Sequence, residues 1–461
     1  MTVSRLLIVG SLAALCGACA TVGPNYTRPN VEAPPAYRGA SETDAAASFA
    51  DQHWDAVFTD DVLQQLIRTA LEQNYDVRIA ASRILQAQAQ FGITRADQYP
   101  TIQGQATGQG QYGTVVQGRR LPAVGSAQIG GAFNWDIDFW GKYRRATEAA
   151  RAEILASEWG RRAVINSLVS SVAASYFDLR ALDSELEISQ RTLASREESL
   201  RLTEVREQGG ATSLVDVRQA EQLVITARGQ IVDLQRRTEE NENALQLLLG
   251  ANPGAIDRGK PLVDQAHAPD VPPGLPSALL DRRPDIREAE QQLVAANAQI
   301  GVARAAYFPD ISLTATGGLA STSLLNLFTA GAWSAAATAV QPIFNAGRIR
   351  SRVELAEARR QEAELEYRRT VQQAFREVSD ALSGYRRFRE LRETQEALVV
   401  AAQDARRLAD LRYQGGATSY LEVLDSETRL FSAQLGLVQA QLDEQSAFVE
   451  IYRALGGGWE S

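Results

Sequence analysis

The sequence has very few of the side chains on which most enzymatic and metal chemistry depends. Its 461 residues include two histidines, His53 and His267, and two cysteines, Cys16 and Cys19. Neither histidine has a second His or Cys at a metal-ligand spacing, and no glycine-rich phosphate-binding loop follows a strand pattern. We therefore expect that the chain is not an enzyme and that it binds no metal ion and no soluble cofactor.

Long apolar runs and an excess of positive charge are also missing. No stretch approaches the ~20 consecutive apolar residues that a membrane-spanning helix needs. The net charge is −9 and the sequence pI is about 5.1, whereas nucleic-acid-binding proteins carry a basic stripe. These absences exclude a membrane helix bundle and a nucleic-acid-binding protein.

The first 18 residues have the parts of a bacterial secretory leader. Arg5 supplies a positive charge, residues 6–15 form an apolar core, and small residues at 17–18 precede Cys19. This end resembles a lipobox, in which that cysteine becomes the acylated first residue. An ordinary leader that is cleaved nearby is the alternative. We expect a signal peptide over 1–18 and a lipid on Cys19. By resemblance to sorted lipoproteins, Ala20 after that cysteine implies the outer membrane of a Gram-negative bacterium. A lipidated mature chain keeps no free thiol.

Proline is absent from two long stretches, 123–252 and 343–461, although the chain has 15 prolines. Because a proline inside a helix costs ~3 kcal/mol, these stretches are free to form long helices. A seven-residue hydrophobic repeat within them is typical of a coiled-coil seam. In the first stretch this seam contains Ile165, Val172, Leu179, Leu186, Leu193 and Leu200. The pattern predicts helices at about 143–207, 213–249, 348–413 and 419–455.

The two halves of the chain repeat each other. Residues 70–102 match residues 279–311, and the sequence QGGATS occurs at 208–213 and again at 414–419. A period near 207 residues is too long for a solenoid and indicates one duplicated unit. We divide the chain into an N-terminal extended segment (19–60), a first repeat (61–252), a proline-rich connector (253–278) and a second repeat (279–461). Each repeat reads as a helix, two strands, a long helix, a Gly-Gly break and a further helix.

The strand segments alternate between polar and apolar residues. In residues 101–112 Gln and Thr alternate with Gly, Ala and Ile, and in the next segment Phe133, Trp135 and Ile137 share one face. Segments of ~10 residues with this alternation are typical of lipid-spanning β-strands. A half-buried strand of a soluble sheet is the alternative. Strands are predicted at about 100–113, 126–140, 309–320 and 332–345.

Four strands cannot close a barrel, because the smallest transmembrane barrels have eight. An open edge in lipid leaves backbone groups unpaired, each at a cost of several kcal/mol. If the strands span a membrane, several copies of the chain must therefore pool their strands.

The lipobox, the GPNYTRP sequence at 23–29, the duplicated β-β-long-helix unit and the paired GGATS breaks together resemble the outer-membrane factor (TolC-like) family. They are most similar to its lipoprotein branch (NodT/OprM-like), which serves resistance-nodulation-division efflux pumps. The resemblance implies a mostly helical α+β fold and a homotrimer. A 12-stranded β-barrel in the outer membrane would continue as a 12-helix barrel in the periplasm. It also implies a periplasmic adaptor (membrane fusion) protein and an inner-membrane transporter as partners.

The resemblance places two classes of site on this chain. The helix reversals, with Gly209, Gly210, Thr212, Gly415, Gly416 and Thr418, match the periplasmic tips that dock an adaptor. They would be simple connectors if no adaptor binds there. Tyr413, Leu421 and Asp425 match the residues of the periplasmic gate. Three copies of Asp425 would form a carboxylate ring that favours cations. A solvated charge on a helix face is the alternative for Asp425.

The expected function is the passive exit duct of a tripartite efflux pump for drugs and other small molecules. A type I protein-secretion duct of the same fold is one alternative. A lipid-anchored periplasmic coiled-coil scaffold is another, although a scaffold has no need of the apolar row at Phe133, Trp135 and Ile137. The sequence names neither the transported compounds nor the particular adaptor and pump.

Overall fold

The computed structural model describes residues 21–38, 49–111, 113, 115–117, 119–120, 124–265, 272–322, 327 and 331–457. The predicted leader, Cys19 and His267 lie outside this set. The elements, in chain order, are η2 (Phe49–Asp51), α2 (Trp54–Val57), α3 (Asp61–Gln73), α4 (Tyr75–Ala96), β1 (Thr101–Gln111), β2 (Val115–Val116), β3 (Arg119–Arg120), β4 (Val124–Ile137), α5 (Lys142–Gln208), α6 (Leu214–Leu248), η3 (Leu262–Asp264), α7 (Pro276–Arg282), α8 (Pro284–Ala305), β5 (Asp310–Ser321), β6 (Gly331–Val340), α9 (Arg348–Gln414) and α10 (Tyr420–Ala454).

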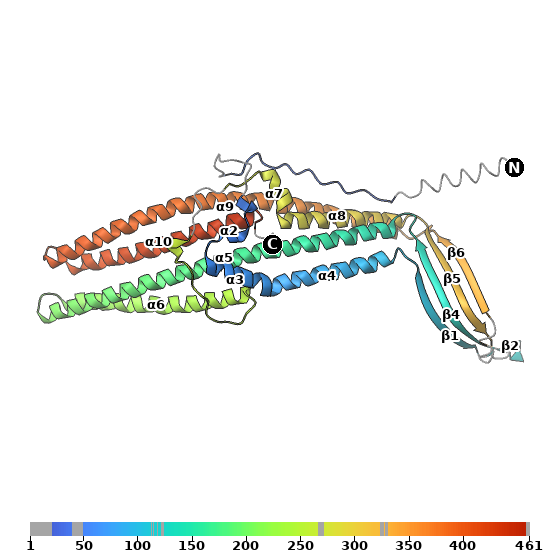
Figure 1. Ribbon diagram of the computed structural model, residues 1–461, viewed down its shortest axis with the longest axis horizontal. Coiled ribbons are helices and arrows are strands. Elements are labelled where there is room, and N and C mark those ends of the chain that lie inside the picture. Colours follow the sequence, from blue (N-terminus) through green and yellow to red (C-terminus); the bar gives the residue numbers. More distant parts are fainter. Residues whose placement is uncertain are drawn as a thin grey trace. The chain divides into compact units, whose positions relative to one another are not determined.

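The internal duplication is present in the lengths of the helices. Helices α4 and α8 have 22 residues each, α5 and α9 have 67 each, and α6 and α10 have 35 each. A helix of 67 residues is about 100 Å long at 1.5 Å per residue. Each repeat thus contains a helix, two principal strands, a long helix and a returning helix (Figure 1).

Two details differ from the expectations drawn from the sequence. Strand β6 ends at Val340 rather than near 345, and Pro342, which has no backbone N–H to donate to a strand ladder, follows two residues later. Part of the segment expected to be extended, 19–60, forms the short helices η2 and α2. These turns bring Trp54 and Val57 into the protein interior.

The chain forms two compact units, and neither of them is a sequence repeat. Among the described residues, one unit contains 21–30 together with those of 82–158 and 288–368, and the other contains those of 31–81, 159–287 and 369–457. Each unit therefore takes segments from both repeats. The first includes all strands, and the second includes the helical hairpins α5–α6 and α9–α10 at their GGATS turns.

The first unit contains a four-stranded antiparallel sheet in the order β1-β4-β5-β6 (Figure 1). The central pair, β4 with β5, joins the two repeats, with Gly130 opposite Gly318 and Trp135 opposite Leu313. The buried cluster between α5 and α8 consists of small side chains, Ala149, Ala152, Ala295 and Ala298, with the half-buried Val294 packed against it.

The N-terminal residues of the first unit are fixed to its helices by one buried arginine. Arg145 of α5 is 4% exposed and donates to the carbonyls of Val22 and Gly23 at 3.3 Å each. It also donates to the Asn25 side chain at 2.8 Å and pairs with Glu148 at 2.8 Å. This network gives an irregular segment a defined path without regular secondary structure.

The core of the second unit is aromatic. Phe58 lies 6.4 Å from Phe177 and 5.8 Å from Tyr452, measured between ring centroids, and Phe49 lies 5.2 Å from Phe448. These rings come from the N-terminal segment, from α5 and from α10. The C-terminal helix is therefore packed against residues near the beginning of the described chain.

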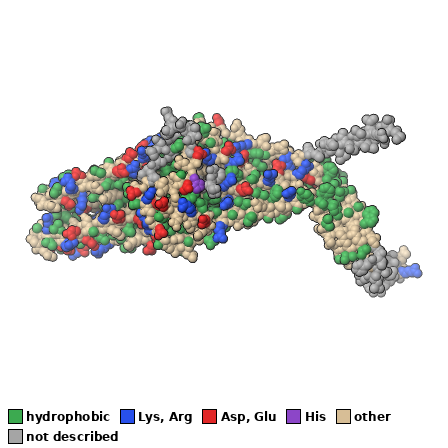
Figure 2. Space-filling view, viewed as in Figure 1, with side chains coloured by type: hydrophobic (Ala, Val, Ile, Leu, Met, Phe, Trp, Pro, Cys, Tyr) green, Lys and Arg blue, Asp and Glu red, His purple; other side chains and the backbone are tan. Residues whose placement is uncertain are grey.

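The surface of the sheet differs in charge from the surface of the helices. On the face shown in Figure 2, uncharged side chains cover most of the sheet, whereas positive and negative side chains alternate over the helices. Among the described residues, no helix carries an apolar stretch of the length and composition needed to cross a membrane.

Candidate functional site

The sheet has one apolar face and one polar face. Residues opposite each other on neighbouring strands point to the same side, and the register therefore defines rows across the sheet. One apolar row is Ile102–Phe133–Ala315–Ala335. The next row faces the other side and contains Gln103, Ala132, Thr316 and Ser334, with Thr316 and Ser334 hydrogen bonded at 2.7 Å. Such a sheet can contact lipid on one face and water on the other.

Aromatic residues mark the end of the sheet that adjoins the helices. The indole of Trp135 donates to the Gln98 carbonyl at 3.1 Å, and that of Trp140 donates to the Pro309 carbonyl at 2.9 Å. Trp140 also stacks on Phe308 at 4.6 Å. Rings with an apolar body and a satisfied N–H are typical of the boundary between lipid and water.

At one point in the centre of the sheet, β4 and β5 lie too close together for either strand to carry a side chain there. A Cβ built on Gly130 would lie 2.4 Å from the Gly317 carbonyl oxygen, and one on Gly318 would lie 2.3 Å from the Ile129 oxygen. Glycine is required at both positions because any larger residue would push the strands apart.

In the first helix reversal, backbone hydrogen bonds end α5 and a side-chain cap begins α6. The Gly210 amide donates to the Glu207 carbonyl and the Ala211 amide to the Arg206 carbonyl, each at 2.8 Å. This is a Schellman motif, which needs the left-handed backbone that Gly210 adopts, with φ of +73°. Ser213 and Asp216 then form a capping box at the start of α6.

The second reversal, between α9 and α10, has the same turn and a different cap. Gly416 has φ of +72°, and the Ala417 amide donates to the Arg412 carbonyl at 2.8 Å. Instead of a capping box, Glu422 accepts from Thr418 and pairs with Arg412 at 2.7 Å. The two turns therefore share a backbone and present different charges.

The structure gives Tyr413, Leu421 and Asp425 three different surroundings. Tyr413 is half-buried, with its ring 5.2 Å from Tyr420 and the Arg206 guanidinium 4.5 Å from its centroid. Leu421 is 58% exposed. Asp425 is exposed and pairs with Arg429, one turn along α10, at 2.7 Å.

Asp425 also lies in a groove of about 740 Å³ between α9 and α10. Its walls are mostly small side chains, among them Ala401, Ala405, Ala409, Ser426, Ala433 and Gly436, and its charged residues are Glu422, Asp425 and Arg429. An exposed pair such as Asp425–Arg429 contributes only ~0–1 kcal/mol to stability, so the carboxylate is free to serve another role.

The buried carboxylate of Asp60 is a structural centre that the sequence analysis missed. It caps α3 through the Val62 and Leu63 amides and accepts from the Tyr176 hydroxyl at 3.0 Å. From the connector, it accepts from the Lys260 amide at 2.7 Å and from the Gln265 side chain at 2.9 Å. An Asp just before the apolar helix pattern DVLQQL was the available signal for the cap alone.

A second feature that was missed is a small cavity between α5 and the α9–α10 hairpin, with both apolar and charged side chains in its lining. Arg196, Arg406 and Glu427 line it. The sequence does contain a signal for this cavity, which is an arginine within a hydrophobic seam. Arg196 lies three residues after Leu193 and four before Leu200.

No metal-binding arrangement of three or more His, Cys, Asp or Glu side chains occurs in the part of the chain that the structure describes. His53 precedes α2 and contacts Asp55 at 2.7 Å near the surface.

Comparison with known proteins decides the family. The profile described as "Outer membrane efflux protein" matches residues 66–251 and 275–457. The chain belongs to this outer membrane efflux protein family. The probable efflux pump outer membrane protein TtgC of Pseudomonas putida is 39% identical over 98% of this chain and 96% of that protein. The cation efflux system protein CusC of Escherichia coli is 36% identical over 95% of this chain and 96% of that protein.

The fold is that of the solved channels of the family. The open state of the MtrE outer membrane channel of Neisseria gonorrhoeae is 32% identical, with a TM-score of 0.87 over 96% of this chain and 99% of that one. This outer membrane efflux protein is therefore an outer-membrane channel with a TolC-like α+β fold. Its role is transport.

Proposed function

We propose that this chain is one third of the exit duct of a tripartite efflux pump. The observation that carries the proposal is the two-faced sheet with open edges. Strands β1 and β6 are the outer strands of the described sheet, and each leaves one side of its backbone unpaired. In lipid such edges must be paired, and three copies of four strands supply twelve.

The polar face of the sheet, which would line the duct, has few groups that could select one compound over another. Its polar face combines Gln, Thr, Ser and Gly side chains, which offer weak hydrogen bonds and no fixed charge along most of the sheet. Relatives bear names for the efflux of antibiotics, toluene and cations. We infer that drugs and other small molecules pass this duct and that the inner-membrane transporter selects them.

A lipid on Cys19 would add a second attachment to the outer membrane. One acyl group binds membranes only weakly, and a sheet and a lipid together give stable anchoring. We expect a Cys19→Ala variant to lose labelling by a radioactive fatty acid while remaining in the membrane fraction. Labelling that persists in the variant would place the lipid elsewhere.

The helix reversals are proposed to dock the periplasmic adaptor. Both present a short, rigid turn with a hydroxyl residue, Thr212 or Thr418, next to a carboxylate. Rigid turns lose little conformational freedom on binding. Both turns have an arginine at the same position, Arg206 or Arg412, but the next residue is Glu207 in the first turn and Tyr413 in the second, so the adaptor meets two similar shapes with different charges.

Asp425 is proposed to form the gate ring, together with Tyr413 and Leu421 of each copy. In a planar bilayer the purified protein should form a cation-selective channel, because a ring of carboxylates attracts cations. Asp425→Ala should raise the single-channel conductance and reduce the preference for cations.

Two controls sharpen this experiment. Asp404→Ala removes another exposed, arginine-paired carboxylate of α9, and we expect it to leave the conductance unchanged. Arg429→Ala frees Asp425 from its partner and should increase cation preference. Equal conductance in the wild type and in the Asp425→Ala variant would mean that Asp425 is an ordinary surface charge.

A further inference from the structure

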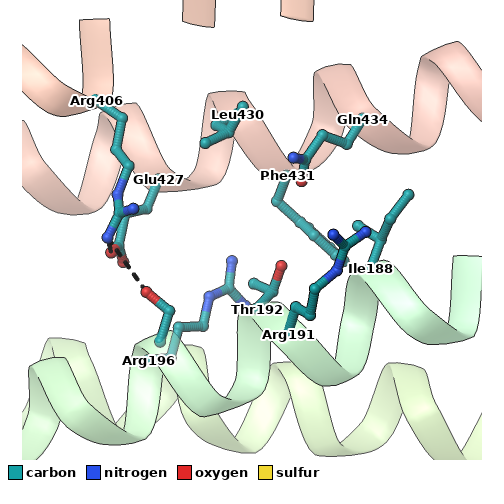
Figure 3. A pocket seen from close by; sticks show the side chains of 10 residues that line it. Ile188, Arg191, Thr192, Arg196, Arg406, Glu427, Leu430, Phe431 and Gln434 are labelled. Carbon is teal, nitrogen blue, oxygen red and sulfur yellow. Dashed lines mark hydrogen bonds and ion pairs between the residues drawn. The ribbon is translucent and has the colours of Figure 1, made fainter. Parts of the chain in front are cut away.

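A cavity of about 160 Å³ lies between α5 and the α9–α10 hairpin in the second unit. Figure 3 shows side chains from both walls reaching into the same space, with Arg196 on α5 and Arg406 and Glu427 on the opposite wall. The polar lining is Arg191, Thr192, Ser195, Arg196, Arg406, Glu427 and Gln434. This lining is rich in hydrogen-bond donors and contains a single carboxylate.

Arg196 is the unusual member of the cavity. It is 4% exposed, and its Nη1 donates to the Leu223 carbonyl at 3.0 Å. The guanidinium also lies 5.2 Å from the Phe431 ring centroid. Its Nε is buried without a hydrogen-bond partner in the described chain. A buried guanidinium with one hydrogen bond to a carbonyl, an aromatic ring and a carboxylate that only partly offsets its burial is poorly compensated for its lost hydration.

Arg406 offers a second open donor from the other wall. Its Nη2 donates to Glu427 at 3.2 Å and to the Ser195 hydroxyl at 3.3 Å, and its Nε lies 3.6 Å from Asp410. That Nε has no hydrogen-bond partner among the described residues. Arg406 thus has two acidic neighbours, Glu427 and Asp410, and Arg196 is the less compensated of the two arginines.

Glu427 offsets the buried charge of Arg196 only in part, because burial still lowers the pKa of Arg196 against the attraction of that carboxylate. Glu427 is 7% exposed, and one of its carboxylate oxygens has no hydrogen-bond partner in the part of the chain described. Burial raises the pKa of Glu427, and the nearby arginines only partly oppose this. Glu427 is therefore protonated more readily than an exposed glutamate.

We propose that this cavity binds a small oxyanion, such as inorganic phosphate, held between Arg196 and Arg406. The volume corresponds to about five water molecules, which is room for one tetrahedral or planar oxyanion. Arginine nitrogens in fixed positions suit phosphate and carboxylate oxygens, and the Thr192 and Ser195 hydroxyls lie on the same wall as Arg196. A bound oxyanion joins α5 to the α9–α10 hairpin and so stabilises their packing.

The experiment uses the full-length protein in detergent, in the oligomeric state in which it is extracted. Binding of radioactive phosphate is measured by equilibrium dialysis. The unfolding temperature is measured with phosphate or chloride at constant ionic strength. A ligand that binds only the folded state raises the unfolding temperature as its concentration rises. Phosphate that neither binds nor shifts unfolding would overturn the proposal and leave a cavity filled by water.

Variants with opposite expected effects locate the site. Arg196→Gln should weaken phosphate binding at least tenfold, which is the loss expected for a charge-assisted hydrogen bond, and Arg196→Lys should restore part of it. Arg407→Gln is the matched control, because that residue is exposed beside Arg406 and pairs with Asp404. It should bind phosphate as the wild type does.

Glu427→Gln should strengthen phosphate binding several-fold, because it removes the only carboxylate in the lining. This variant keeps the proposal testable if Arg196→Gln fails to fold. A purely structural role for these residues predicts the reverse, with Glu427→Gln destabilised and its phosphate binding unchanged or weaker. That result would also overturn the proposal.

Discussion

Asp60 shows how much structure one buried carboxylate can organise. It accepts hydrogen bonds from α3, from α5 and from the connector between the repeats. Asp60→Asn keeps the size of the side chain, removes its charge and turns one acceptor into a donor. We expect a loss of about 1–3 kcal/mol in the free energy of unfolding, measured by urea denaturation. Asp61→Asn, on the exposed first turn of α3, should change little, and equal effects of the two would contradict this role.

The same residue gives a pH dependence with a defined sign. Burial acts to raise the pKa of Asp60, but hydrogen bonds from Gln265, the Leu63 and Lys260 amides and Tyr176 outweigh it, and the pKa is lowered. The stabilisation by Asp60 is therefore complete at pH values above the pKa of an unfolded aspartate, about 4. It is lost as the pH falls through the lower pKa that Asp60 has in the folded protein. The stability difference between wild type and Asp60→Asn should shrink below pH 4.

Single residues were predictable from the sequence where a local rule applies and not where distant contacts decide. The glycines of the two GGATS breaks follow from the backbone that a helix reversal needs. The partners of Asp60 come from positions as distant as Gln265, and the neighbours of Arg196 include Leu223 of α6 and Phe431 of α10. No spacing in the sequence records such contacts. Asp425 was picked out by resemblance, and its pair with Arg429 emerged only from the structure.

At the scale of the element, the helix reversals give a matched pair of substitutions. Gly210→Ala places a Cβ on a residue with φ of +73°, a conformation that costs an L-residue ~1–2 kcal/mol, although space is available. Gly209→Ala, in the same turn, has no positive φ and its nearest contact would be 3.6 Å away. Thermal unfolding should therefore show Gly210→Ala to be destabilised relative to Gly209→Ala.

The reverse order of stability would mean that the turn is remodelled in solution. Because Gly416 and Gly415 repeat the geometry, the second reversal serves as an independent copy of the same measurement.

Helices and strands were predictable where the residue pattern alone determines which of the two can form. Absence of proline and a seven-residue repeat are enough to expect long helices, and alternation is enough to expect strands. The pairing of β4 with β5 was not predictable, because their register depends on residues that are far apart in the sequence, such as Phe133 and Ala315. The end of β6 at Val340 also escaped, since alternation alone does not register the proline that follows.

At the scale of the whole molecule, the open sheet predicts the state of assembly. The extracted protein should have about three times the 50.2 kDa of the full chain, less the leader. Light scattering coupled to size-exclusion chromatography, corrected for detergent, measures this mass. A stable monomer that still conducts ions would contradict the pooling of strands, because four strands cannot enclose a pore.

The sequence predicts two consecutive repeats, whereas the folded chain divides differently. Each compact unit combines segments from both repeats, because the halves of the sheet meet at β4 and β5 and the aromatic core joins Phe58 to Tyr452. The similarity between the two repeats reflects their origin by duplication and does not determine which segments pack together. Packing follows whichever apolar surfaces can be buried together, and that is decided in three dimensions.

The pairing of β4 with β5 also sets a condition on biogenesis. Residues 138–309 must be exported between the two strands, and the Tyr452 hydroxyl finally donates to the Gln52 carbonyl, 400 positions earlier. Until then β1 and β4 present unpaired edges and an apolar face to the periplasm, which invites aggregation. The sheet therefore cannot be completed until β5 has been delivered, and the interval between the export of β4 and that of β5 is the stage at which the chain is most open to aggregation.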